Sequence, residues 1–129
     1  MGATALLAPL LLAPLLLSTA AAAQDAPALG RRLFEPCTAC HSREAGKPGM
    51  AGPDLAGLAG RVLGGAAGFD YSPVLRRARA AGAVWDEARL LAFLEDPEAM
   101  FPGMWMSSGG IADPAERQAL ARYLLSRDP

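Results

Sequence analysis

The stretch Cys37-Thr38-Ala39-Cys40-His41 holds both cysteines and the single histidine of the chain. The spacing C-x-x-C-H is typical of covalent haem attachment. Two residues between the thiols let both sulfur atoms reach the vinyl groups on one edge of a porphyrin, and the adjacent imidazole can then bind the iron from below the ring. The motif therefore predicts one covalent haem c, held through Cys37 and Cys40, with its iron bound by His41.

Two other interpretations of this motif find less support in the sequence. A C-x-x-C pair acts as a thiol redox site within a βαβ surrounding, and no such pattern of strands is readable here. Structural zinc needs four ligands, but the chain has no further Cys or His to complete half a site.

Length and composition are compatible with one small domain built around a cofactor. The chain has 129 residues, of which 52% are apolar and 6% aromatic, and this length suits one domain better than two. A domain of roughly 100 residues is marginal at burying its own core, so a large apolar cofactor at its centre would help. The net charge is −1, from 12 basic and 13 acidic residues. Without a basic excess to neutralise phosphates, nucleic acid is not expected as a partner.

The N-terminal segment has the character of an export signal. Residues 1–23 form a Leu- and Ala-rich run without charge, and residues 21–23, Ala-Ala-Ala, fit an Ala-x-Ala cleavage site. The segment lacks the usual basic residue at its start, and about 20 apolar residues can also span a bilayer, so a retained anchor is the alternative. Pro9 and Pro14 weaken a continuous helix and favour cleavage. We interpret residues 1–23 as a signal peptide and residues 24–129 as a domain exported to the bacterial periplasm, or anchored facing it.

The remaining patterns predict an all-α fold with long loops. Ser72 before Pro73, Asp86, and Asp113 with Glu116 three residues on are helix-start signals, with the serine and aspartates as N-caps. Residues 24–28 read as a lead-in, Pro36 as a helix end, and the Gly- and Pro-rich residues 42–68 as loop. No convincing strand is found. The expected helices cover residues 28–34, 73–81, 86–95, 97–101 and 114–126.

A haem iron bound by His41 has a sixth position that no second histidine can fill. The candidates are Met50, Met100, Met104 and Met106, although a methionine is more often a core filler than a ligand. The stretch Pro102-Gly103-Met104-Trp105-Met106 favours its own two methionines, because it is a Gly-containing loop after a helix stop. They alternate along an extended segment, so only one is expected to aim at the iron.

Several segments, in order and at familiar spacings, resemble those of a known family. They are Gly30-Arg31-Arg32-Leu33-Phe34, the attachment motif, Gly52-Pro53-Asp54-Leu55, Gly57-Leu58-Ala59-Gly60-Arg61, Gly68-Phe69-Asp70-Tyr71, Trp85, Leu94-Glu95-Asp96-Pro97, Pro102-Gly-x-x-Met106 and Leu120 to Leu124. The chain resembles class I cytochrome c in its mitochondrial and related bacterial forms. The resemblance implies a small cytochrome c fold, with four to five short helices and long loops wrapped around one haem.

The resemblance also implies roles for individual residues. It selects Met106 as the axial ligand and assigns the Pro53 carbonyl to the non-ligating nitrogen of His41. Tyr71 and Trp85 would donate hydrogen bonds to one haem propionate.

Arg61 would lie near the other propionate. The residues alone leave a plainer alternative open: Tyr71 and Trp85 as ordinary core aromatics, and Arg61 as a solvated charge.

The implied function is that of a monomeric single-electron carrier, not an enzyme. Its partners would be redox proteins such as a cytochrome bc complex, a terminal oxidase, a photosynthetic reaction centre or a periplasmic dehydrogenase, with membrane contact only through them or a retained anchor. Two features depart from the family: residues 72–83 offer no equivalent of an Asn near the Met ligand, and Lys47 is the only lysine, so the family's lysine ring is missing. The alternative function is a haem peroxidase-like or gas-binding sensor cytochrome with a displaceable methionine.

Overall fold

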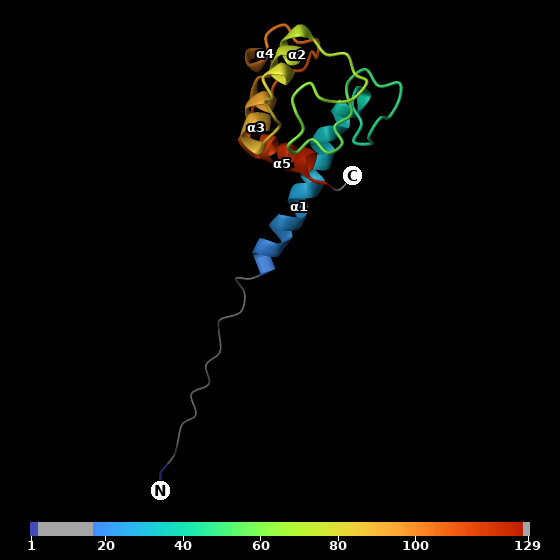
Figure 1. Cartoon of the computed structure of the whole chain (residues 1–129). Helices are drawn as coiled ribbons and strands as arrows, with labels where there is room; N and C mark the ends of the chain where they lie inside the picture. The colour runs from blue at the N-terminus through green and yellow to red at the C-terminus, as the bar shows by residue number, and fades with distance from the viewer. Residues whose placement is uncertain (3–16, 128–129) are drawn as a thin grey trace.

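The structure, a computed structural model, describes residues 1–2 and 17–127 (Figure 1). A long loop separates the N-terminal elements from three helices that precede the C-terminal one. The elements are α1 (Leu17–Phe34), the 3₁₀ helix η1 (Glu35–Ala39), α2 (Pro73–Ala80), α3 (Glu87–Glu95), α4 (Pro97–Met100) and α5 (Pro114–Leu125). The only β pairing in the described part of the chain is an isolated bridge between Val62 and Val84. The predicted all-α fold is confirmed.

The first and last helices cross closely and form the base of the domain. Gly30 of α1 is buried, and a Cβ atom at this position would lie 2.5 Å from both the carbonyl oxygen of Ala119 and the Cβ of Tyr123. Only glycine allows this approach without displacing α5. Next to the crossing, Phe34 packs on Tyr123 with ring centroids 5.8 Å apart and joins Leu120 in the main core.

The N-terminal helix is longer than the sequence suggested. The prediction of a lead-in at residues 24–28 is wrong, because α1 begins at Leu17 and includes Pro27. Alanine has the highest helix propensity, so the alanines before Pro27 extend α1 toward the N-terminus. The later part of α1 packs against α5. Pro36 lies in the first turn of η1 instead of ending α1 directly. None of the helices within the described residues is both long and apolar enough to cross a bilayer. Most of the predicted signal segment, residues 3–16, lies outside the described residues.

Helix starts follow the predicted caps, and two of the three cap side chains bind the backbone of their helix. The carboxylate of Asp86 accepts a hydrogen bond from the Arg89 backbone, and that of Asp113 accepts from Ala115 and Glu116 at 2.7 and 3.0 Å. Ser72 is the N-cap residue of α2, as predicted, but its side chain makes no capping hydrogen bond.

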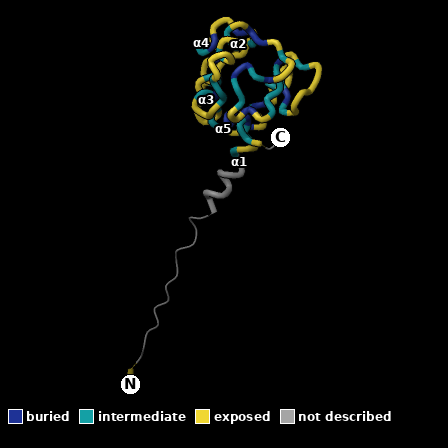
Figure 2. Tube along the Cα trace, in the orientation of Figure 1, coloured by how far each residue is buried: buried dark blue, intermediate teal, exposed yellow. Residues whose placement is uncertain are grey.

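The loop between η1 and α2 is not a surface excursion, because parts of it are buried (Figure 2). Leu58 joins the core beside α3 and α5, and Leu63 forms a second cluster with Phe101 and Met104. The loop, the helices and the segment after α4 thus surround one central space.

Candidate haem-binding site

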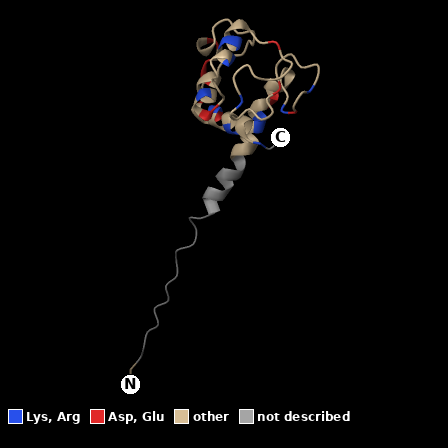
Figure 3. Cartoon of the chain, viewed as in Figure 1, with Lys and Arg blue, Asp and Glu red and all other residues tan. Residues whose placement is uncertain are grey.

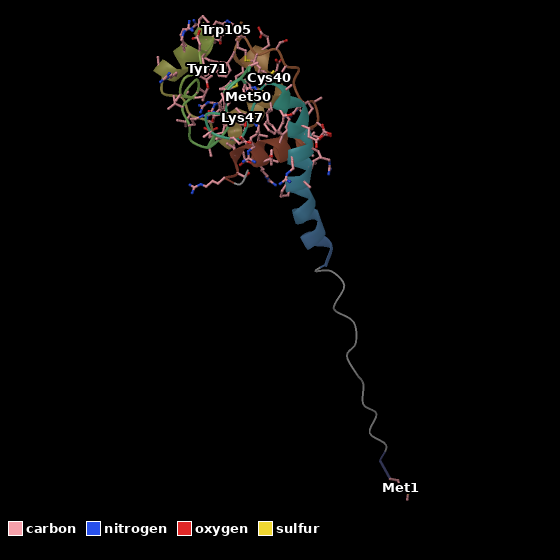
Figure 4. All side chains as sticks on the ribbon, turned by 90° about the vertical axis from the view of Figure 1, so that its right-hand side faces the viewer. Met1, Cys40, Lys47, Met50, Tyr71 and Trp105 are labelled. Carbon is pink, nitrogen blue, oxygen red and sulfur yellow. The ribbon has the colours of Figure 1, made fainter. Side chains whose placement is uncertain are left out.

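The central space is a cavity of about 460 Å³. Its volume falls in the range of small-molecule and cofactor sites, and most of its wall is apolar, including Phe34, Leu58 and Leu120. Residues of the attachment motif, the Gly/Pro-rich loop, α2, α3, α5 and the methionine loop all reach it. In Figure 4, Cys40, Tyr71 and Trp105, which come from three separate segments, lie at the same end of the domain.

The attachment motif forms a tight turn at the edge of this cavity. The carbonyl oxygen of Cys37 accepts hydrogen bonds from the backbone N–H groups of Cys40 and His41, at 3.1 and 2.9 Å. Cys37 is half-buried and Cys40 is exposed, and both line the cavity. Burial, with the neighbouring Cys40 second, raises the pKa of the Cys37 thiol. The turn places two sulfur atoms on one rim, as attachment to one porphyrin edge requires.

The imidazole of His41 is held in one orientation by the loop that follows. Its Nδ1 lies 2.8 Å from the carbonyl oxygen of Pro53. Since a carbonyl can only accept, Nδ1 carries the hydrogen and Nε2 keeps a free lone pair for a metal ion. Gly52 passes directly over the ring: a Cβ there would lie 2.7 Å from Nδ1 and 2.9 Å from Nε2. This glycine makes room for the ring, as a preformed ligand site requires.

Arg61 lies on the cavity wall in a nearly buried ion pair that the sequence did not predict. Its guanidinium is 3.1 Å from the Asp54 carboxylate, and the two side chains are 19% and 15% exposed. It also donates to the backbone oxygens of Asp54 and Ala56, at 2.6 and 3.0 Å. Arg61 thereby fixes the turn after Pro53, and its charge is partly balanced within the chain.

Tyr71 and Trp85 bring two hydrogen-bond donors to the cavity. The Tyr71 oxygen accepts from the Ala66 backbone N–H at 3.2 Å, which leaves its own O–H to donate. Burial raises the pKa of Tyr71, so the phenol stays neutral. Trp85 packs edge-on against Phe93 at 5.2 Å, and its backbone bonds to Gly60 and Arg61 anchor it.

Ser72, the N-cap residue of α2, also lines the cavity, which was not predicted. It is only 2% exposed, lines the cavity, and its hydroxyl has no hydrogen-bond partner among the described residues. A buried hydroxyl without a partner is costly. Next to the free O–H of Tyr71, it fits an acceptor such as a haem carboxylate. Its position directly after Tyr71 was the available signal.

The methionine candidates separate into two pairs. Met50 and Met100 do not line the cavity, whereas Met104 and Met106 both do. The expectation that these two alternate in direction is wrong, because residues two apart in an extended segment lie on the same side. Met104 is 8% exposed and belongs to the core cluster with Leu63 and Phe101, and Met106 is partly buried against that cluster. Together with the cysteines, His41, Pro53, Arg61, Tyr71 and Trp85, Met106 completes a set of predicted site residues that all border one cavity.

The described residues form a small all-α domain with an apolar cavity, two cysteines on its rim and a preoriented imidazole. These features define a haem protein of the covalent, single-haem class. The family model for cytochrome c matches residues 27–128. The chain therefore belongs to the cytochrome c family.

Individual relatives agree in sequence and in structure. Cytochrome c2 iso-2 of Magnetospirillum fulvum is 44% identical over 93 residues, covering 72% of this chain and 93% of the relative. Cytochrome c2 of Agrobacterium tumefaciens is 37% identical over 98 residues, with 76% and 88% covered. The solved structure of cytochrome cH from Methylobacterium extorquens superposes with a TM-score of 0.66 at 38% identity, covering 76% of this chain and 95% of that one. The chain is a monohaem c-type cytochrome that carries single electrons on one covalent haem c, and it works with redox partner proteins.

Proposed function

We propose that this cytochrome shuttles electrons between redox enzymes of an energy-conserving membrane, and that His41 and Met106 would hold its haem iron. The observation that carries this is the imidazole locked by the 2.8 Å bond to Pro53, with Nε2 free, in a cavity that a methionine thioether also borders. A haem bound in this cavity would supply the one-electron chemistry.

Packing favours Met106 over Met104 as the second ligand. Met104 is taken up by the core cluster around Leu63 and Phe101, which is the usual role of a methionine. Met106 only borders this cluster, so its thioether is less committed to packing. The resemblance of Pro102-Gly-x-x-Met106 to the family's ligand loop points the same way.

The residues of the pocket favour the reduced state in two ways. A thioether together with an imidazole would raise the reduction potential of a haem that both hold, and the apolar wall would disfavour the additional charge of its oxidised form. The Pro53 bond makes the imidazole more basic and fixes its plane. Because His41 and Met106 would both come from within the chain, little of the pocket would need to move when an electron is exchanged.

We assign the propionates to the polar side of the cavity. Tyr71, Trp85 and the orphaned hydroxyl of Ser72 can each donate a hydrogen bond there, and Arg61 can contribute charge. Because Asp54 already pairs with Arg61, the attraction that Arg61 offers is weaker than that of a free guanidinium.

We further propose that residues 1–23 are a cleaved export signal and that the mature domain works in the periplasm as a monomer. Its partners would be a cytochrome bc complex, a terminal oxidase, a reaction centre or a dehydrogenase. A mass measurement on the exported protein tests the processing: loss of residues 1–23 plus the mass of one haem is expected. A protein that retained residues 1–23 would favour an anchor.

Carbon monoxide separates an electron carrier from an enzyme or sensor. If Met106 occupies the sixth position, the ferrous protein at neutral pH should keep its Soret spectrum under carbon monoxide, and a potentiometric titration should follow a one-electron curve. A rapid Soret shift on adding the gas would contradict the carrier assignment, since it would reveal an open or easily displaced sixth position.

A further inference from the structure

The methionine loop turns one aromatic side chain outward beside the haem cavity. Trp105 is 62% exposed, and Met1 is the only other exposed large hydrophobic residue in the described part of the chain. Its neighbours Met104 and Met106 point to the interior, which directs the indole outward, yet Trp105 still borders the cavity. A protein that contacts this indole therefore lies against the opening of the haem site.

The helix next to this tryptophan carries positive charge without acidic residues of its own. Helix α2 contains Arg76, Arg77 and Arg79, all exposed, and no Asp or Glu (Figure 3). The guanidinium of Arg76 lies 6.0 Å from the centre of the Trp105 ring and pairs with Asp70 at 3.2 Å. Arg77 and Arg79 have no ion-pair partner among the described residues.

This positive region has a defined border and does not follow from the overall charge. The chain has a net charge of −1, so a basic helix is a local feature. On the other side of the methionine loop, exposed Glu98 of α4 accepts a hydrogen bond from the Gly103 backbone at 2.9 Å. The charge beside Trp105 therefore changes sign from α2 to α4, which gives a docking partner a preferred orientation.

We propose that Trp105 with Arg76, Arg77 and Arg79, here called the Trp–Arg face, is the docking surface for the electron-transfer partner. The partner is a redox protein that presents an apolar spot to Trp105 and carboxylates to α2. Tryptophan and arginine are the residues most often found to dominate binding energy at interfaces, and opposite charges steer the encounter and fix its orientation. The proposal rests on the electron-carrier function.

Two double variants with the same change in net charge test the electrostatic part. Arg77→Glu/Arg79→Glu alters the face, and Arg31→Glu/Arg32→Glu alters two exposed arginines of α1 that do not line the cavity. The ferrous holoprotein is oxidised in a stopped-flow instrument by hexacyanoferrate(III), an anion, and by tris(phenanthroline)cobalt(III), a cation. At about 0.1 M salt, the charge of the reagent interacts mainly with side-chain charges within about 10 Å of it.

The face variant should react roughly tenfold more slowly with the anion and faster with the cation, because the local field is reversed. The α1 variant should stay within about twofold of the wild type for both reagents. Equal effects of the two variants would show that only net charge matters, and would overturn the proposal.

The aromatic part is tested with membranes of the source organism as the redox partner. Trp105→Ser should raise the KM for the cytochrome several-fold at both low and high salt, whereas the effect of Arg77→Glu/Arg79→Glu should disappear at high salt. If the membranes oxidise or reduce the wild-type cytochrome and both variants have the same KM as the wild type, the proposed docking surface is wrong, although the carrier function holds. If the membranes neither reduce nor oxidise the wild type, the assigned partners are wrong. The rates with hexacyanoferrate(III) and tris(phenanthroline)cobalt(III) then still test the Trp–Arg face.

Discussion

A methyl group added at Gly52 is expected to displace the imidazole of His41. The new Cβ would lie 2.7 Å from Nδ1 of His41, whereas heavy atoms in contact rest at about 3.5–4.0 Å. The ring must therefore move by about 1 Å, enough to stretch the 2.8 Å bond to Pro53 beyond hydrogen-bond length. Overpacking costs about 1–3 kcal/mol, and the half-buried carbonyl of Pro53 that loses its partner adds up to about 1 kcal/mol, the lower end for a buried group. Gly52→Ala should therefore lower the free energy of unfolding by about 1–4 kcal/mol.

Guanidinium unfolding of the oxidised holoprotein, followed through the Soret band, measures this difference. Gly109→Ala is the matched control, because a Cβ at Gly109 meets nothing within 4 Å and its backbone is not in the left-handed region. The control should be neutral, or stabilised by up to about 1 kcal/mol through the unfolded state. If Gly52→Ala unfolds within about 0.5 kcal/mol of the wild type, the contact between this loop and the imidazole is not as described.

Three further changes test other parts of the fold. Gly30→Ala places a Cβ 2.5 Å from the Ala119 carbonyl oxygen and should separate α1 from α5, at a cost of about 1–3 kcal/mol; an unchanged thermal midpoint would refute this crossing. Asp113→Ala removes the acceptor for two backbone N–H groups and should cost about 1 kcal/mol in urea unfolding, whereas Asp113→Asn should cost less. Because burial raises the pKa of Tyr71, its phenol ionises in the unfolded chain, near pH 10, before it does so in the folded one. Wild-type stability should thus fall above about pH 10 more steeply than that of Tyr71→Phe, and parallel pH curves would argue that Tyr71 is not buried.

Local patterns were sufficient to predict the chemistry and most helices. The attachment motif depends on residues adjacent in sequence, and the caps at Asp86 and Asp113 bind backbone groups two or three residues on. Such short-range interactions leave a clear trace in the sequence.

The features that were missed depend on tertiary contacts. Ser72 lines the cavity, and its buried hydroxyl makes no bond to its own helix, because the burial of this position is set by residues distant in the sequence. The Asp54–Arg61 pair joins residues across a turn whose shape no pattern specified. The early start of α1 shows that a run of alanines can outweigh a proline.

The far-red sulfur-to-iron absorption band of the oxidised protein tests the ligand pair most directly. It should be present in the wild type and in Met104→Ala, where only a core side chain is shortened, and absent in Met106→Ala. A band that survives in Met106→Ala and disappears in Met104→Ala would show that the other thioether binds the iron, and would contradict the central assignment.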